Sequence, residues 1–574
     1  MNRLYSYFTG KVIYILIGFA VLVNLSGLFD TIMGPDAALY ASISKTMVLK
    51  NDFVNLFYGG RDWLDKPHFP FWVTALSFKF FGINTWAYKL PGILFLMMGG
   101  WYTYLFATNL YNKTVGLWAV LILLTAQHIV LSNNDMRAEP YLTGLIIAAV
   151  YHFYQCNISR SLIHLLLASL FTAIAIMTKG MFALIPIGCA IAGGLIMKGQ
   201  WKDLFQVRWL VALILIGIFI LPEIYCLYQQ FDLHPEKIVF EKKNVSGIRF
   251  FFWDGQFGRF FDTGPIKGKG NVFFYIHTTL WAFLPWSILL FVAIATLIRK
   301  GLRRRKDHEW YCLSGSLLTF IFFSLSKFQL PYYLNIIFPF FAIIVAQYLY
   351  RISSVKIIYR IGLLQNIIAC LFLCTPVFLQ FFYKPENISW AWLSLLCLLI
   401  LVFNLLPPIR PDVPAKILYR TAIGSFCLNI YFNLTFYPSL SHYQTGSEAA
   451  IWINKNVQND LPAFTMQWSA PYIFYLNRKF YCTDTTLQNI SAKEFLLYLS
   501  DEQVNQLASK GKKPDFKKNG QLPHNSFEYE VSKFKNTESG CGENGYSPGK
   551  AVNINIYKMS HDKMQSIKTF FISC

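Results

Sequence analysis

The sequence contains few charged residues. Asp, Glu, Lys and Arg make up 14% of its 574 residues, whereas a typical soluble protein has about 25%. Hydrophobic residues make up 55% of the chain. This combination excludes an ordinary soluble protein and predicts an integral membrane protein. The formal net charge of +21 does not indicate nucleic-acid binding, because most basic residues stand in short loops between apolar runs.

Several common catalytic motifs are also missing. The chain has no Walker A or GxGxxG phosphate loop, so nothing in it indicates a nucleotide-binding enzyme. It has neither the GxSxG elbow of a hydrolase nor a CxxC or Cys/His metal spacing. No repeat of about 20–50 residues is evident. The first apolar run lacks a small-residue cleavage site, so we expect it to remain as a helix and not to be removed as a signal peptide.

Long apolar stretches, in contrast, are abundant. About thirteen of them approach the roughly 20 residues that cross a bilayer. They lie near residues 12–29, 90–109, 115–131, 140–156, 162–177, 181–197, 209–228, 272–298, 311–325, 331–350, 361–382, 390–407 and 420–437. From residue 438 the composition becomes polar and mixed. The sequence therefore predicts an all-α polytopic transmembrane domain over residues 1–437 and a soluble α/β domain over residues 438–574.

The basic residues predict the orientation of these helices. Lys and Arg concentrate in alternate short loops, which are expected on the cytoplasmic side together with the N-terminus. An odd number of crossings then places residues 438–574 on the outer, periplasmic side. Two long loops, about residues 30–89 and 229–270, also fall outside. Within the first of them, Asp36 to Leu49 and Phe69 to Phe81 are expected to form short interfacial helices.

Polar clusters stand at the predicted outer ends of the helices. Charged residues at a membrane boundary are functional candidates, because burying them unpaired is costly. Their clustering on one face predicts a single site. The clusters are Gly34-Pro35-Asp36, Asp65-Lys66-Pro67, Asp135 to Glu139, Thr178-Lys179-Gly180 and Ser326 to Tyr333, with Gln256 to Arg259 as a further candidate.

Each cluster also has a purely structural interpretation. Lys179 is a candidate membrane anchor whose ammonium reaches the interface. Arg137 and Glu139 are candidates for a structural ion pair. Asp36 is a candidate helix cap. The abundant Phe and Trp residues are expected to face lipid and neighbouring helices.

In order along the chain, these clusters resemble one known family. The first loop reads Asp36-Ala37-Ala38-Leu39-Tyr40-Ala41-Ser42-Ile43 and continues to Met47, and about 30 residues after the Asp comes Asp65-Lys66-Pro67-His68 before an aromatic helix. Further matches are Phe80 to Asn84, Leu90-Pro91, Met177 to Gly180, Pro285-Trp286-Ser287 and Ser324 to Tyr333. Over about residues 1–350 the chain resembles the bacterial branch of the protein O-mannosyltransferase and aminoarabinose transferase superfamily.

The resemblance implies both a fold and an activity. The fold is that of the family C glycosyltransferases, in the bacterial inner membrane. The implied reaction transfers a hexosyl or pentosyl group from a polyprenyl-phosphate donor to lipid A, a protein or another envelope glycan, with inversion at the sugar. The sequence differs from the family pattern in two places: Ala37 stands where the family often has Glu, and Asp65 replaces a longer carboxylate.

The residues suit this reaction. A carboxylate is the usual general base for an acceptor hydroxyl, and the resemblance implies Asp36. Cations balance a leaving phosphate, for which Lys66, Arg259 and Lys179 are candidates, with Tyr333 as a hydrogen-bond donor. The candidates to orient the acceptor or support the site are Asp65, Glu139 and Arg137. The sequence indicates no cofactor other than a possible divalent cation, for which Asp65 and Glu139 are the candidate ligands.

Other functions remain open at this point. A lipid or glycan transporter or flippase is expected to carry its charges near the bilayer midplane, in repeated halves with broken helices. An oligosaccharide polymerase or ligase is expected to have a large outer loop late in the chain. A non-catalytic scaffold that displays the outer tail leaves the charged clusters without a purpose.

Overall fold

The computed structural model describes residues 2–301, 310–382, 414–442, 444–457, 461–466, 468–482, 494–500 and 554–560, with the single residues 396, 399 and 503. The chain divides into two compact units. One contains Met1–Phe57 and Asp62–Ser439, and the other contains Tyr58–Arg61 and Leu440–Cys574. The predicted span near 390–407 lies almost wholly outside the described residues.

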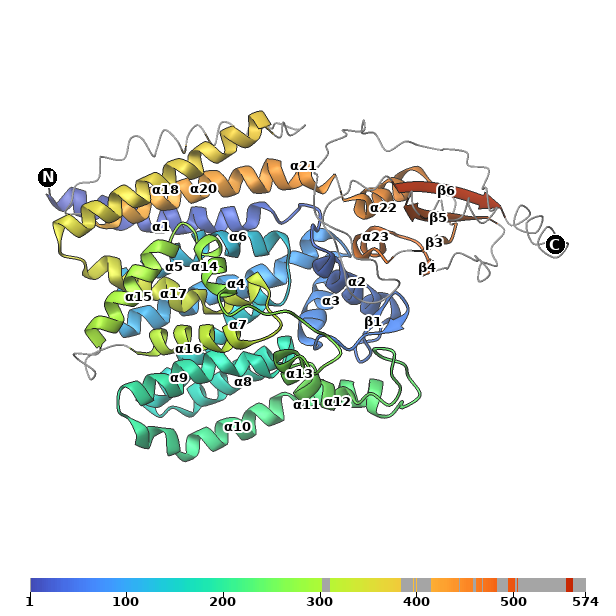
Figure 1. Cartoon of the computed structure of the whole chain (residues 1–574), viewed down its shortest axis with the longest axis horizontal. Coiled ribbons are helices and arrows are strands. Elements are labelled where there is room, and N and C mark those ends of the chain that lie inside the picture. The colour runs from blue at the N-terminus through green and yellow to red at the C-terminus, as the bar shows by residue number, and fades with distance from the viewer. Residues whose placement is uncertain are drawn as a thin grey trace. The chain divides into compact units, whose positions relative to one another are not determined.

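The first unit is built from helices (Figure 1). A two-stranded sheet of β1 (Phe57–Tyr58) and β2 (Arg61–Asp62) interrupts the first long loop. The helices are α1 (Asn2–Ser26), α2 (Pro35–Lys50), α3 (Phe69–Phe81), α4 (Thr85–Leu110), α5 (Lys113–Thr125), α6 (Gln127–Asn134), α7 (Glu139–Ser159), α8 (Leu162–Lys179), α9 (Leu184–Met197), α10 (Val207–Phe219), α11 (Leu221–Leu227), α12 (Gly247–Arg249), α13 (Phe257–Phe261), α14 (Phe274–Ala282), α15 (Ser287–Gly301), α16 (Tyr311–Leu325), α17 (Phe338–Arg351), α18 (Val355–Phe382), α20 (Pro414–Tyr431) and α21 (Tyr437–Ser441).

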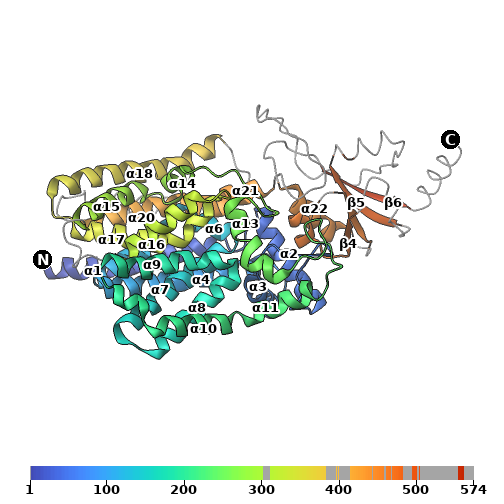
Figure 2. The same ribbon diagram turned by 60° about the horizontal axis from the view of Figure 1, so that its bottom comes forward.

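The helix packing is that of a membrane protein. Helix α7 is buried along most of its length and crosses α4 closely. At the crossing, a Cβ added to Gly144 would lie 2.1 Å from the Phe95 carbonyl oxygen, so only glycine allows this approach. Helix α10 lies at the edge of the bundle beside α8 in both views (Figure 2). Its exposed side chains, such as Leu210 and Leu213, are apolar, which is the character of a lipid-facing surface.

The apolar stretches are less regular than the sequence predicts. Among the described residues, four helices are long and apolar enough to cross a membrane, or up to six if each bent pair counts as one span. The predicted span 115–131 bends by 51° between α5 and α6, and the predicted span 209–228 bends by 41° between α10 and α11. The predicted span 272–298 is divided into α14 and α15 around Pro285, which has no N–H to continue a helix.

The two predicted short helices of the first long loop are confirmed as α2 and α3. Pro35 occupies the first turn of α2, where a missing N–H costs nothing. The helix ends at Asn51, whose φ of 51° turns the chain away in the left-handed conformation. Helix α3 also has a proline, Pro70, in its first turn. Both helices therefore have local start signals, and their observed bounds agree with the predicted bounds to within one residue.

The second unit contains both helices and strands. Strand β3 (Ala463–Thr465) pairs in parallel with β4 (Phe480–Cys482) and β5 (Glu494–Ser500), and β5 pairs antiparallel with β6 (Ile554–Ser560). Helices α22 (Thr445–Asn456) and α23 (Ala470–Tyr475) supply a small apolar core with the sheet. In this core Tyr472 stacks on Tyr498 with 4.2 Å between ring centroids.

Candidate active site

Asp36 lies in the first turn of α2, immediately after a tight loop. A Cβ added to Gly34 would lie 1.9 Å from Asp135 Oδ1, so this loop packs directly on the end of α6. The Lys89 ammonium, from α4, donates to the carbonyls of Gly27 and Asp30, at 2.8 Å each. These contacts fix the chain that leads from α1 to Asp36. The Asp36 side chain itself is 54% exposed, so an acceptor can reach it.

Arg137 connects this carboxylate to two other elements. Its guanidinium donates to Asp36 and to the Tyr332 hydroxyl. It also pairs with Asp135 at 2.6 Å, and it stands 4.3 Å from the centroid of the Tyr332 ring. Because Arg137 holds two carboxylates and one phenol, the first turn of α2, the end of α6 and the 3-10 helix before α17 meet at a single cation.

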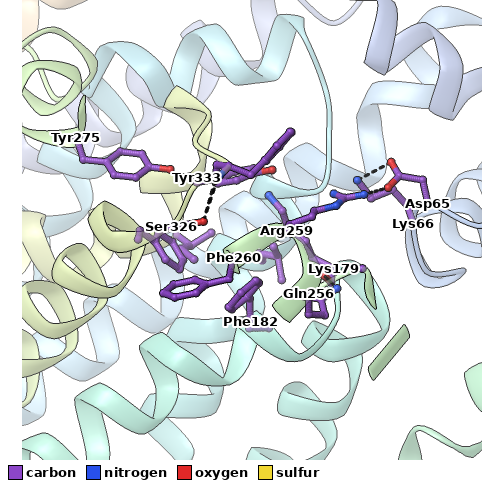
Figure 3. Close-up of a pocket in the computed structure, with 16 residues that line it drawn as sticks. Asp65, Lys66, Lys179, Phe182, Gln256, Arg259, Phe260, Tyr275, Ser326 and Tyr333 are labelled. Carbon is purple, nitrogen blue, oxygen red and sulfur yellow. Dashed lines mark hydrogen bonds and ion pairs between the residues drawn. The ribbon is translucent and has the colours of Figure 1, made fainter. Parts of the chain in front are cut away.

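A second cluster forms around Asp65, between β2 and α3. The Lys66 ammonium donates to Asp65 Oδ2 at 2.7 Å, and Arg259 from α13 pairs with Asp65 Oδ1. Figure 3 shows the guanidinium of Arg259 extended toward Asp65 and Lys66. The side chains of Lys66 and Arg259 are 15% and 12% exposed. One carboxylate thus holds two nearly buried cations, and the cluster retains a net positive charge.

Lys179, at the end of α8, approaches the same region. Its ammonium pairs with Glu139 and lies 3.7 Å from the centroid of the Tyr333 ring. The next residue, Gly180, has φ of 91°, and a Cβ there would lie 2.2 Å from Gln256 Nε2. Gln256 in turn donates to the Lys179 carbonyl at 3.2 Å. Gly180 therefore allows α8 to end against the segment that carries Arg259.

These cations line a pocket with two kinds of wall. The polar wall includes Asp65, Lys66, Lys179, Gln256 and Arg259. The other wall is apolar and aromatic, and Figure 3 shows several of its side chains. Its members are Leu142, Phe182, Phe260, Tyr275, Phe323, Phe328 and Ile336. A pocket of this kind suits a ligand with an anionic head and a hydrocarbon chain.

The electrostatics of Lys66 follow from its surroundings. Burial lowers the pKa of the Lys66 ammonium to about 8, and the nearby carboxylates of Asp36 and Glu139 offset this only in part. Arg137 lowers the pKa of Lys66 further. An anion placed beside Lys66 would favour its charged form. The pocket therefore suits an anionic ligand, which would stabilise the charged form of Lys66.

The carboxylates do not form a metal site. Among the described residues, no three His, Cys, Asp or Glu side chains are grouped so that they could hold a metal ion. Asp65 is already paired with Lys66 and Arg259, and Glu139 with Lys179. With both carboxylates engaged by cations in this way, the two candidate metal ligands do not fit a divalent metal ion.

The structure brings all of the predicted site residues into one region of the first unit. The predicted ion pair between Arg137 and Glu139 is wrong: Arg137 pairs with Asp36 and Asp135, and Glu139 pairs with Lys179. The candidate cap role of Asp36 is also wrong, since α2 has no side-chain cap. Sequence reasoning chose Tyr333 and missed its neighbour Tyr332, although both stand in the same motif.

Known proteins share both the sequence signals and the fold. Residues 65–225 match the family described as dolichyl-phosphate-mannose-protein mannosyltransferase. An uncharacterized protein of Aquifex aeolicus (strain VF5) is 23% identical over 479 residues, which is 82% of this chain and 86% of that protein. An undecaprenyl phosphate-alpha-4-amino-4-deoxy-L-arabinose arabinosyl transferase of Edwardsiella ictaluri (strain 93-146) is 27% identical over 62% of this chain and 61% of its own length. This chain thus aligns with less than two thirds of that relative.

The fold also matches that of a solved structure. The crystal structure of ArnT from Cupriavidus metallidurans bound to undecaprenyl phosphate matches 87% of this chain and 95% of its own chain, with a TM-score of 0.69 and 19% identity. The architecture is therefore that of a family C glycosyltransferase. In the order of its motifs, in the family match over residues 65–225 and in its fold, the chain is similar to the protein O-mannosyltransferases and aminoarabinose transferases.

Proposed function

We propose that this protein is a membrane glycosyltransferase that moves a sugar from a polyprenyl-phosphate donor to an envelope acceptor. The observation that carries the proposal is the pocket in which Lys66, Arg259 and Lys179 face an aromatic, apolar wall. The cations would balance one phosphate, and the apolar wall would hold the first isoprene units. The relatives named as undecaprenyl phosphate-aminoarabinose arabinosyl transferases support this donor class.

The proposed reaction is a single displacement. Asp36 takes the proton of the acceptor hydroxyl while its oxygen attacks the anomeric carbon. The bond from that carbon to the phosphate oxygen breaks, and its electron pair leaves with the lipid phosphate. Lys66 and Arg259 stabilise the charge that develops on this phosphate. Because one carboxylate acts without a covalent intermediate, the configuration of the sugar inverts.

The donor class can be tested with the purified protein in proteoliposomes. We expect transfer when a polyprenyl-monophosphate sugar is supplied and none when a nucleotide sugar is supplied in lipid free of polyprenyl phosphate. Candidate acceptors are lipid A, a hydroxyl-bearing protein and an envelope glycan, each offered in turn. Turnover with the nucleotide sugar alone would refute the donor assignment. Movement of the lipid-linked sugar across the bilayer without transfer would favour a flippase instead.

The site is proposed to face the periplasm. Four to six of the described helices or bent helix pairs are long and apolar enough to cross a membrane, and the proposal takes the number of crossings, about thirteen, from the apolar stretches of the sequence. With the N-terminus in the cytoplasm, this number places Asp36 and residues 438–574 outside. The chain would then belong to the inner membrane, with a periplasmic C-terminal domain.

This orientation gives a direct prediction. Protease added to intact spheroplasts is expected to remove the C-terminal 438–574 region and to leave the N-terminal part, because only the outer face is accessible. An epitope placed before residue 12 serves as the inner control and is expected to survive. Cleavage of the tail only in inverted vesicles would contradict the proposed topology.

A further inference from the structure

A buried pair of ionisable side chains lies directly behind the Lys66 segment. The side chains of His68 and Glu223 are both 0% exposed. Glu223 Oε2 accepts from the His68 backbone N–H at 3.0 Å, and Glu223 Oε1 lies 2.9 Å from His68 Nδ1. The other ring nitrogen, Nε2, lies 2.9 Å from the Val54 carbonyl oxygen. His68 is thus held on three sides, two of them by one carboxylate.

The protons of this pair can be assigned from its partners. A carbonyl oxygen only accepts, so His68 Nε2 must carry a hydrogen and donate to Val54. One further proton lies between His68 Nδ1 and Glu223 Oε1. Whichever atom holds it, the pair as a whole is neutral, which limits the cost of burying it. Removing one partner would leave the other buried without a hydrogen-bond partner, a change that is typically strongly destabilising.

The same helix holds the first loop at other points. Gln230 lies seven residues after Glu223, about two helical turns along, in the continuation of α11. Its side chain donates to the Leu56 carbonyl at 2.8 Å and accepts from the Leu56 N–H at 2.9 Å. It also donates to Asp62 at 2.9 Å. The loop is therefore held at residues 56, 62 and 68, and the pocket residues Asp65 and Lys66 stand between the last two.

We propose that His68 and Glu223 are positioning residues that hold Lys66 in the donor pocket, an inference that rests on the proposed function. Lys66 is two residues from His68, and the backbone of His68 is tied to Glu223. Trp72, whose ring lies 5.3 Å from that of His68, donates to the Phe53 carbonyl and closes the same loop. Without Glu223, Lys66 would lose its fixed place opposite Arg259.

The test compares variants of Glu223 in the proteoliposome assay. Glu223→Leu is expected to raise the donor KM about tenfold or more, because small displacements of a binding group are costly, and to change kcat less. Glu223→Gln is expected to remain within about threefold of wild type, because its amide can accept from the His68 N–H and donate to Nδ1. Rescue by the amide would show that the hydrogen bonds matter and the charge does not.

A matched control separates positioning from stability. Gln365, on α18, is also buried and bonds the Pro285 carbonyl and Thr421, at 3.2 Å each. Gln365→Leu is expected to lower the melting temperature and to leave the donor KM unchanged. The second readout is the pH at which donor use declines. If Glu223→Leu releases Lys66 into solvent, its pKa returns toward its ordinary value, and the alkaline decline moves to higher pH.

The outcomes are distinct. An unchanged donor KM and an unchanged alkaline decline in Glu223→Leu would overturn the positioning role while leaving the proposed function intact. If wild-type protein transfers no sugar from any polyprenyl-phosphate donor, the proposed function itself fails. If Glu223→Leu does not fold, the double variant His68→Leu/Glu223→Leu replaces both partners and leaves no buried charge. Wild-type donor KM in a folded double variant would equally refute the proposal.

Discussion

Asp36→Asn is expected to abolish transfer while the protein remains folded and inserted. An asparagine keeps the size of the side chain but cannot take a proton from the acceptor hydroxyl. General-base catalysis typically contributes about 10²–10⁴-fold, so kcat should fall by at least about 10²-fold. The Asp36 side chain is 54% exposed, so its neutralisation should affect stability little. Initial rates with saturating donor and acceptor measure the effect.

Asp135 provides a control that shares the same partner. Arg137 pairs with both Asp36 and Asp135, so a variant of either residue disturbs the same cation. If Asp36 acts only by holding Arg137, then Asp135→Asn should be equally damaging. We expect Asp135→Asn to retain at least about ten times more activity than Asp36→Asn, because only a base loses a proton-transfer step. Equal losses, or an active Asp36→Asn protein, would refute the assignment of Asp36 as the base.

Lys66→Ala is expected to cause the second large loss, a fall in donor kcat/KM. The variant removes a charged donor from a pocket in which Lys66 is only 15% exposed. Removal of one preorganised donor to a developing anion typically costs about 10²–10³-fold, so donor kcat/KM should fall in that range. Loss of Lys66 also leaves Asp65 with Arg259 as its remaining cation partner in the described site. Lys243→Ala, at an exposed position of the second long loop, should leave donor kcat/KM unchanged.

Lys66 also predicts a pH dependence. Burial lowers the pKa of Lys66 to about 8, and only its protonated form attracts the phosphate. Donor kcat/KM should therefore decline above about pH 8, approaching tenfold per pH unit. The charged groups around Lys66 are Asp36, Asp65, Arg137, Glu139, Lys179 and Arg259.

The Lys66→Arg variant tests whether the titration of Lys66 causes the alkaline decline, because it keeps a positive charge at this position. Arginine remains protonated at every pH of the assay, so the alkaline decline should disappear if Lys66 causes it. Because the arginine side chain is longer and forked, a lower plateau of kcat/KM is compatible with the prediction. A decline that persists unchanged near pH 8 in Lys66→Arg would assign the titration to another group and weaken the phosphate-binding role of Lys66.

Some of the breaks in the predicted membrane spans have a local signal in the sequence, and others do not. Pro285 divides α14 from α15, and Pro222 stands in the first turn of α11 after the break from α10. Both prolines were visible in the sequence, and the long apolar runs around them obscured the breaks. The bend at Ala126 has no such signal. There the N–H of Gln127 donates to the Leu284 carbonyl at 2.8 Å in place of a carbonyl within its own helix.

The candidate site was also only partly predictable from the sequence. The residue types were recognisable from the sequence, because charge beside an apolar stretch is costly to bury and therefore stands out. The partners that these residues bind were not recognisable from the sequence. Arg259 meets Asp65 across 194 residues and Arg137 meets Tyr332 across 195. Each bond depends on where distant helices end, and no local pattern encodes that.

By itself, the sequence determined the membrane class, the short helices α2 and α3, the resemblance to one superfamily and the set of charged residues that form the candidate site. Apolar composition, proline positions and motif order are local properties, so they can be read without a fold. Only the tertiary structure decided the ion pairs, the bends and the buried His68–Glu223 pair. His68 and Glu223 are 155 residues apart in the sequence, and only packing brings their side chains within 2.9 Å of each other. Hydrogen bonds act only at contact distance, so the sequence alone could not predict this pair.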